Sequence, residues 1–224
     1  MDISTLPVLY SFKRCPYAIR ARTALAFANI DYIHREINLR DKHPIFLETS
    51  PKGTVPVFVD THNDMIIDES FDIVVYALQT NLPKGWMNNE VLDLKSSQVI
   101  FEKLNKEAIP AIRSIKYDVT HGADRDTATD QINQYLLDLD ALLSKHRFLV
   151  DQPSALDLLV FPNLRQLTIH DPQWLKKYGF ASVERWLDCW ISHPIFKKVF
   201  VTHPQWEENQ RPIVTDNQHG YSMI

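Results

Sequence analysis

The sequence is poor in cysteine and glycine and has no long apolar run, and each shortage excludes a class of protein. Only 2 of the 224 residues are cysteines, Cys15 and Cys189, and they stand far apart. This argues against a disulfide framework and favours a reducing compartment, so we expect a cytoplasmic protein. Only 5 residues are glycines, and a glycine-rich phosphate loop is missing, so nucleotide binding is not expected. No apolar run reaches the roughly 20 residues that span a bilayer, so no membrane partner is expected either.

Metal-ligand patterns and a strong net charge are lacking too. The 9 histidines are scattered, without a His-x-x-x-His pair or a cysteine–histidine cluster at zinc spacing, so no metal is predicted. The net charge of -4 gives no reason to expect nucleic acid as a partner. A hydrophobic fraction of 45% is ordinary for a globular protein, and the chain is long enough for one large domain or two small ones.

The pattern of the sequence changes near residue 80. Before that point, short apolar runs rich in β-branched residues alternate with helical patterns, which is typical of a compact α/β unit. The segment 81–87 is polar and broken by Pro83 and Gly85, as linkers are. Beyond it the period is helical almost throughout. We therefore predict an α/β domain over 1–80, a linker over 81–87 and an all-helical domain over 88–224.

The first domain is expected to hold short strands and helices, and the second to hold long helices. Strands are expected at 7–10, 32–37, 55–59 and 65–67, and helices at 16–28, 70–79, 88–116, 125–146, 154–170, 180–192 and 195–200. Pro110 and Pro162 fall inside helical patterns and are expected to kink them.

Cys15 stands where the strand Pro7–Tyr10 turns into a helix that begins at Pro16. Proline suits the first helical turn, because the N–H that it lacks would have no partner there. The free N–H groups and the positive end of the helix dipole favour a thiolate, and Lys13 and Arg14 add positive charge. Such surroundings lower the pKa of a cysteine, so we interpret Cys15 as a nucleophile. The alternative is a small residue that merely begins the helix.

A second cysteine is missing from the place where a Cys-x-x-Cys motif would have it, since Ala18 stands there. A single thiol cannot close a disulfide with its neighbour, so an outside thiol must resolve any mixed disulfide that it forms. The sequence therefore predicts a small thiol cosubstrate, and glutathione is the obvious candidate.

Three further features of the first domain suit a small peptide as ligand. A cis bond between Val55 and Pro56 would turn the N–H and C=O of Val55 toward that ligand. Glu69 can pair with an ammonium group, and Ser70 opens a helix whose free N–H groups can hold a carboxylate. Lys42, in a polar loop, can meet a second carboxylate. The plainer alternatives are an ordinary helix cap for the first pair and a solvated surface side chain for the lysine.

Taken together, these residues resemble the glutathione transferase superfamily, and within it the cysteine-type, omega-like members. The resemblance rests on four motifs in the family's order and spacing, and it covers essentially the whole chain. They are Cys15-Pro16-Tyr17-Ala18, Val55-Pro56, Glu69-Ser70 and Ser154-Ala155-Leu156-Asp157, the last being a helix capping box.

The resemblance implies a thioredoxin-like N-terminal domain that binds glutathione as cosubstrate. Val55 and Pro56 would bind its cysteinyl part through the backbone, and Glu69 and Ser70 its γ-glutamyl end. Lys42 would reach the glycine carboxylate. The family also implies an all-α C-terminal domain, in which Ser154 and Asp157 have a structural role, and a homodimer.

The resemblance further implies thiol–disulfide exchange through a mixed disulfide between Cys15 and glutathione. The second substrate would be a disulfide or a hydrophobic electrophile, held in a cleft between the domains. Tyr17, Ile109 and Tyr117 are candidates for lining that cleft. Trp206, in the polar tail from Gln205 to Ile224, either folds back over the cleft or belongs to a mobile tail.

Two alternatives stay open at this point. A hydroxyl group of Tyr10, Ser11 or Tyr17 would make the protein a conjugating transferase instead of a thiol transferase. The same fold also occurs in binding or regulatory proteins without catalysis, for example in stress-response proteins that contact RNA polymerase.

Overall fold

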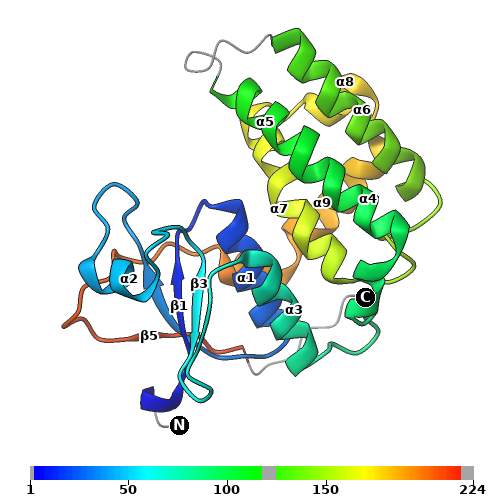
Figure 1. Ribbon diagram of the computed structural model, residues 1–224. Coiled ribbons are helices and arrows are strands. Elements are labelled where there is room, and N and C mark those ends of the chain that lie inside the picture. The colour runs from blue at the N-terminus through cyan, green and yellow to red at the C-terminus, as the bar shows by residue number, and fades with distance from the viewer. Residues whose placement is uncertain (1–2, 118–124, 218–224) are drawn as a thin grey trace. The chain divides into compact units, whose positions relative to one another are not determined.

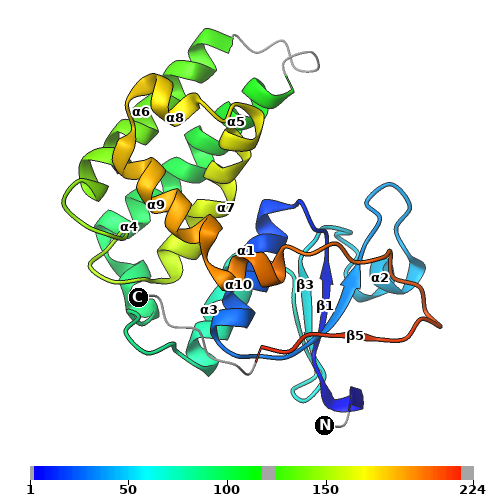
Figure 2. The same ribbon diagram turned by 180° about the vertical axis from the view of Figure 1, so that it is seen from behind.

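The structure, a computed structural model, describes residues 3–117 and 125–217 of the chain. The chain divides into two compact units (Figure 1 and Figure 2). The first comprises Met1–Lys84 and Pro194–Ile224, and the second comprises Gly85–His193. The end of the chain thus belongs with the first unit, whereas the sequence pattern assigned 88–224 to one helical domain. The last residues of the predicted tail, 218–224, lie outside the described residues.

The first unit is built on a five-stranded sheet with the order β4-β3-β1-β2-β5. β1 runs parallel to β2 and antiparallel to β3, while β4 and β5 pair antiparallel with β3 and β2. All four residues of β1 are buried, as is typical of a central strand covered on both faces. The first four strands lie where the sequence predicts strands, and β5 was not predicted. The strands are β1 (Val8–Ser11), β2 (Ile33–Glu36), β3 (Val57–Asp60), β4 (Met65–Ile67) and β5 (Ile213–Val214).

Helices cover both faces of this sheet. α1 (Pro16–Phe27) and α3 (Ser70–Thr80) pack against each other on one face, and α2 (Pro44–Thr49) lies on the other (Figure 1). α10 (Pro194–Val199) packs against α1. The pattern predicts all of these helices except α2, which has only six residues and begins in a segment that was interpreted as a polar loop.

The sheet face toward α2 carries an apolar core that we call the Tyr10 cluster. Trp206, from the tail, belongs to it and is only 9% exposed. Trp206 therefore packs into the core of the first unit, which neither of the two alternatives for the tail described. Cys15 is partly buried and packs against the same cluster. The cluster consists of Val8, Tyr10, Ala18, Ile37, Phe46, Val55, Val57 and Trp206.

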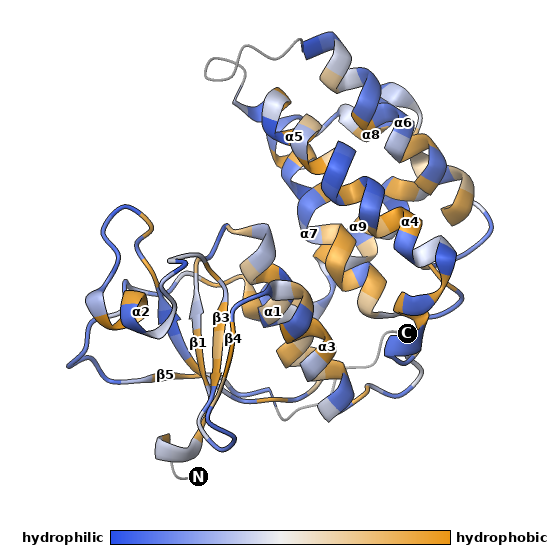
Figure 3. Ribbon diagram, in the orientation of Figure 1, coloured by the Kyte–Doolittle hydropathy of each residue, from blue (hydrophilic) through white to orange (hydrophobic). Residues whose placement is uncertain are grey.

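The second unit is helical. Its central helix is α7, whose residues from Ala155 to Leu164 are all buried, and Figure 3 shows the strongly apolar colour of its first turns. The helices of this unit are α4 (Lys95–Lys103), α5 (Ile109–Lys116), α6 (Arg125–Leu143), α7 (Ala155–His170), α8 (Trp174–Tyr178) and α9 (Ala181–Ser192). Among the described helices, none combines the length and the apolar character that crossing a membrane requires.

The helix predicted over 88–116 is interrupted rather than continuous. A 3-10 turn, Asn89–Asp93, precedes α4, and a π-helical turn, Leu104–Ala108, separates α4 from α5. Pro110 is one of the first residues of α5, directly after that turn. Since proline has no N–H to donate to the preceding turn, the interruption stands where a regular helix would lose a hydrogen bond.

The capping box predicted at the start of α7 is formed. The backbone N–H and the hydroxyl of Ser154 lie 3.1 and 2.9 Å from Oδ2 of Asp157. Both side chains are fully buried, so the box fixes the start of the central helix inside the core of the second unit.

Candidate functional site

Cys15 is the N-cap residue of α1 and follows the turn after β1. Its N–H donates to the carbonyl of Phe12 (3.1 Å), and its own carbonyl accepts from the N–H of Ile19 (2.9 Å). Backbone hydrogen bonds on both sides therefore hold the residue in place. Its sulfur lies 3.7 Å from the carbonyl oxygen of Val55, in the loop that precedes β3.

The peptide bond between Val55 and Pro56 is cis, which is the isomer that the family resemblance implies. Both residues are buried, and they come just before β3 begins at Val57. The backbone of Val55 therefore stands outside the ladder of the sheet and directly beside the Cys15 sulfur.

Glu69 and Ser70 lie at the start of α3, with Glu69 as the N-cap and Ser70 as the first helical residue. The ammonium group of Lys52 lies 2.5 Å from Oε1 of Glu69 and 3.3 Å from Oδ2 of Asp68. Hydrogen bonds to these two carboxylates raise the pKa of Lys52. Ser70 is buried, and its hydroxyl accepts a 3.4 Å hydrogen bond from Arg20. Lys52 is a residue of this site that the sequence analysis missed.

Lys42 lies against the same loop, next to Gly53. A Cβ atom placed on Gly53 would lie 3.3 Å from Nζ of Lys42 and 3.1 Å from Cδ2 of Leu47. Gly53 also has φ +60, a conformation that favours glycine. Glycine at this position therefore leaves the space that the Lys42 side chain fills.

The loop between α2 and β3 brings the predicted residues together. Its Val55 contacts Cys15, its Gly53 borders Lys42, and its Lys52 pairs with Glu69. The sulfur of a cysteine, a cis-proline backbone and groups of both charges thus lie at one loop of the first unit. This arrangement suits a small ligand that carries a thiol, an ammonium group and carboxylates.

Comparisons with known proteins agree with this geometry. Residues 9–84 match the family model described as "Glutathione S-transferase, N-terminal domain". Over these residues the chain is similar to that domain. The chain is 37% identical over 70 residues to "Glutathione S-transferase U22" of Arabidopsis thaliana, a match that spans 31% of each chain. The chain thus spans about a third of the length of such curated relatives.

Longer matches exist at lower identity. "Glutathione S-transferase omega-1" of Sus scrofa is 25% identical over 162 residues, which cover 71% of this chain and 66% of the relative. A glutathione transferase from Pseudomonas putida, solved with glutathione disulfide bound, superposes with a TM-score of 0.74 at 16% identity. The superposition covers 89% of this chain and 93% of that one. The whole chain therefore has the fold of a glutathione transferase, with a thioredoxin-like unit and a helical unit.

The pKa of Cys15 differs from the expectation. Burial raises the pKa of the Cys15 thiol above its ordinary value and outweighs the groups that lower it. The expected lowering of the pKa is therefore wrong, because the sequence shows the dipole and the cations but not the loss of water. The groups that lower it are the N–H groups of Ala18 and Tyr17 and the charges of Arg22 and Arg20.

The raised pKa predicts that the reactivity of Cys15 increases with pH throughout the neutral range. Below its pKa, the thiolate fraction of a cysteine rises about tenfold per pH unit. We therefore expect the rate of Cys15 alkylation by iodoacetamide, followed by mass spectrometry of its peptide, to rise about tenfold from pH 6 to pH 7 and again to pH 8. A rate that levels off below pH 7 would show that the pKa is lowered after all.

The three hydroxyl groups near the site have different exposures. Ser11 is fully buried, and its hydroxyl accepts a 2.5 Å hydrogen bond from Arg22. Tyr10 is 2% exposed, and its hydroxyl accepts a 2.5 Å hydrogen bond from Arg35. Tyr17 is 37% exposed. Of these three hydroxyls, Tyr17 alone belongs to a side chain that is open to solvent.

The two candidates from the helical unit lie at the ends of α5. Ile109 is its first residue and Tyr117, which is half exposed, is its C-cap, so the two are about 12 Å apart along the axis. The structure does not bring them together. Within the described part of the chain, no group of histidine, cysteine or acidic side chains is placed to hold a metal ion.

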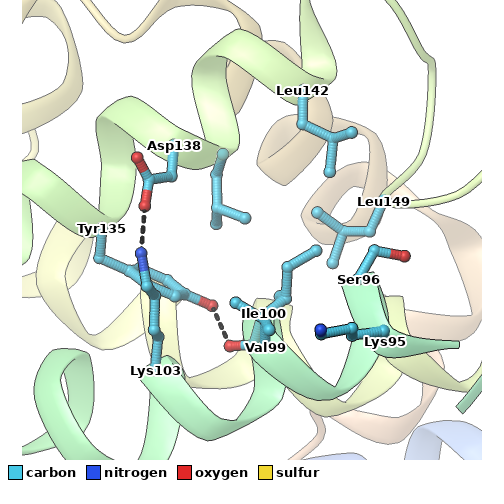
Figure 4. A pocket seen from close by; sticks show the side chains of 10 residues that line it. Lys95, Ser96, Val99, Ile100, Lys103, Tyr135, Asp138, Leu142 and Leu149 are labelled. Atoms are coloured by element: carbon cyan, nitrogen blue, oxygen red, sulfur yellow. Dashed lines mark hydrogen bonds and ion pairs between the residues drawn. The ribbon is translucent and has the colours of Figure 1, made fainter. Parts of the chain in front are cut away.

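The helical unit also contains a pocket of about 460 Å³ between α4 and α6 (Figure 4). An ion pair between Lys103 and Asp138 (2.7 Å) lies beside it, and the Tyr135 hydroxyl donates to the carbonyl of Ile100 (3.4 Å). Its walls are mainly apolar and hold neither of the two cysteines, so we assign it no part in thiol chemistry. The apolar lining consists of Val99, Ile100, Leu139, Leu142 and Leu149.

Proposed function

We propose that the protein is a glutathione-dependent thiol transferase that works through a mixed disulfide between Cys15 and glutathione. The proposal is based on the position of the Cys15 sulfur, which lies 3.7 Å from the carbonyl oxygen of Val55, the residue before the cis-proline. A single thiol at this place has no second cysteine to resolve it, so the chemistry needs glutathione. The Pseudomonas putida protein of the same fold binds glutathione disulfide, which supports this choice of ligand.

Glutathione is proposed to lie along the loop between α2 and β3. The N–H and C=O of Val55 would pair with its cysteinyl backbone and so place its sulfur beside Cys15. The N–H groups at the start of α3, at Ser70, would hold the γ-glutamyl carboxylate, and Glu69 would hold the ammonium group. Lys42 would pair with the glycine carboxylate.

The reaction is an exchange of disulfides in two steps. The Cys15 thiolate attacks the glutathionyl sulfur of a mixed disulfide, the S–S bond breaks, and the second substrate leaves as a thiolate that takes up a proton. The thiolate of a second glutathione then attacks the same glutathionyl sulfur, releases glutathione disulfide and restores the Cys15 thiolate. Glutathionylated thiols would be substrates of these two steps. With an electrophile of the dehydroascorbate type, the Cys15 thiolate would add to a carbonyl carbon, a glutathione thiolate would attack the Cys15 sulfur, and the C–S bond would break to release the reduced substrate and leave the same mixed disulfide for a second glutathione.

The proposal is tested with 2-hydroxyethyl disulfide and glutathione as substrates. We expect turnover that depends on glutathione. When the protein is incubated with glutathione disulfide alone, we expect a covalent adduct of one glutathione on the Cys15 peptide. Glutathione binding without adduct or turnover would favour a conjugating transferase that uses the Tyr17 hydroxyl. Absence of glutathione binding would favour a binding module without catalysis.

The two lysines around the loop are predicted to affect glutathione binding in opposite directions. Lys42→Met removes a cation from the proposed carboxylate site, so we expect about tenfold weaker binding. Lys52→Met frees Glu69 for the ammonium group of glutathione, so we expect binding up to about fivefold tighter. Titration calorimetry of both variants measures these changes, and each variant is the matched control of the other because both lose one lysine.

Desamino-glutathione, which lacks the γ-glutamyl ammonium group, separates the two effects. The gain in Lys52→Met should disappear with this ligand, while the loss in Lys42→Met should remain. Equal changes in both variants would mean that only the total charge matters, and neither lysine would then have the assigned role.

A further inference from the structure

The tail of the chain places one large side chain beside the proposed glutathione site. The indole of Trp206 packs against the ring of His43, with 4.5 Å between ring centroids, and its edge contacts Tyr10 at 5.9 Å. The guanidinium group of Arg35 lies over the indole at 4.2 Å. Three side chains of the first unit therefore contact Trp206.

His43 links this indole to α2. It is the N-cap residue of α2, and its Nδ1 accepts a 3.3 Å hydrogen bond from the N–H of Ile45. It also follows Lys42 directly in the sequence. A side chain that fixes the His43 ring therefore fixes both the first turn of α2 and the start of the Lys42 loop.

α2 cannot be stable by itself, because six residues are too short for an isolated helix. Its stability has to come from packing, and its one buried side chain is Phe46. Phe46 and Trp206 both belong to the Tyr10 cluster, and the Phe46 ring lies 5.2 Å from that of Tyr10. The tail thus completes the apolar surface against which α2 packs.

The tail is anchored on both sides of Trp206, so the position of the indole is defined by backbone bonds. The N–H of Trp206 donates to the carbonyl of Glu36 (2.8 Å), the last residue of β2. This bond lies beyond the residues of β2 that pair with β5. Further along, β5 pairs with β2, and the N–H of Thr215 donates to the carbonyl of Tyr32 (3.0 Å). On the other side, the Lys13 ammonium group bonds to the hydroxyl of Thr202.

We propose that Trp206 is a positioning residue for the glutathione site: it fixes His43 and the first turn of α2, and through them Lys42. The affinity for glutathione then depends on a side chain near the far end of the chain. This inference rests on the proposed function for its effect on glutathione, but the effect on α2 stands without it.

The test compares Trp206→Ala with Trp206→Phe and with Val214→Ala, a control in β5 whose side chain is exposed and outside the Tyr10 cluster. Hydrogen exchange of peptides from residues 43–50 is measured first. We expect exchange about tenfold faster in Trp206→Ala, a smaller change in Trp206→Phe and none in Val214→Ala, while peptides of α1 and α3 stay unchanged. Unchanged exchange at 43–50 in Trp206→Ala would overturn the inference.

Steady-state kinetics then separate positioning from chemistry. For Trp206→Ala we expect the KM for glutathione to rise about tenfold, with kcat within about twofold of the original value. A fall in kcat at constant KM would overturn the positioning role. If Trp206→Ala does not fold, Trp206→Leu replaces it, because leucine keeps an apolar side chain but removes the ring that packs on His43, and the same faster exchange at 43–50 is required. Failure of the wild-type protein to bind glutathione would refute the proposed function, and hydrogen exchange would still decide the role of Trp206 in α2.

Discussion

Replacing Cys15 by serine is expected to reduce glutathione-dependent turnover of 2-hydroxyethyl disulfide by about 1,000-fold or more. The substitution replaces the polarizable sulfur atom by an oxygen atom and leaves the shape of the site nearly intact. A serine hydroxyl is not ionised at neutral pH, so it cannot attack a disulfide sulfur as a thiolate does. Glutathione binding should stay within about twofold, because the groups proposed to bind its charged ends do not include Cys15.

The matched control is Cys189→Ser, since Cys189 is the other cysteine of the chain and lies on α9 in the helical unit. Its variant should retain full turnover and still form the glutathione adduct at Cys15. Turnover that survives in Cys15→Ser would refute the mixed-disulfide mechanism. Loss in both variants would point to a requirement for two thiols.

Replacing Asp157 by alanine is expected to lower the free energy of unfolding of the helical unit by about 3–5 kcal/mol. The carboxylate is fully buried and accepts from three residues. Alanine would leave these donors buried without an acceptor, at a cost of about 1–3 kcal/mol each, and part of that cost is offset because a carboxylate no longer has to be buried. The donors are the N–H of Leu149 (3.1 Å), the N–H and hydroxyl of Ser154 (3.1 and 2.9 Å) and the indole N–H of Trp186 (2.8 Å).

Denaturant unfolding followed by circular dichroism measures this loss, and Asp151→Ala is the control because Asp151 is an exposed acidic residue close by in the sequence. Its variant should stay within about 0.5 kcal/mol of the original stability. A loss below about 1 kcal/mol in Asp157→Ala would mean that water reaches the donors and that the box is not a buried network.

Because Asp157 titrates, the free energy of unfolding is also expected to depend on pH. Burial raises the pKa of Asp157 to about 6, above the ordinary 3.8, in spite of the four hydrogen bonds. Because the folded state then binds the proton more readily than the unfolded state, stability increases as pH falls from 7 toward 4 and is constant above 7. The stability of the original protein relative to Asp157→Asn should therefore increase between pH 7 and pH 5 and stay constant between pH 7 and pH 8.

Local patterns in the sequence were enough to predict much of the fold and part of the site. Cys15-Pro16 after a short strand and the capping box of Asp157 each depend on a few adjacent residues, and the structure has both. The cis state of the Val55–Pro56 bond was implied only by the family resemblance, and the structure has it. Lys52 could not be predicted, because a lysine in a loop carries no signal until the loop is seen beside Glu69.

The remaining errors came from contacts between distant parts of the chain. The pKa of Cys15 was expected to be lowered, because its sequence neighbours are positive and it begins a helix, but burial beside the Tyr10 cluster raises it. The place of Trp206 was left open because a polar segment with a single aromatic residue has no period to interpret. What decides both cases is tertiary packing, which no short window of sequence contains.

The return of the tail also has a consequence for biosynthesis. A ribosome releases the chain from its N-terminus, so β1, β2 and β3 emerge long before β5 and Trp206. At translation rates of about 5–20 residues per second, the thioredoxin-like unit lacks its fifth strand for roughly ten seconds or more. During that interval the edge of β2 is unpaired and exposed to other nascent chains. Protein made from a message that ends early would keep this edge permanently, which makes its removal by quality control the expected fate of such fragments.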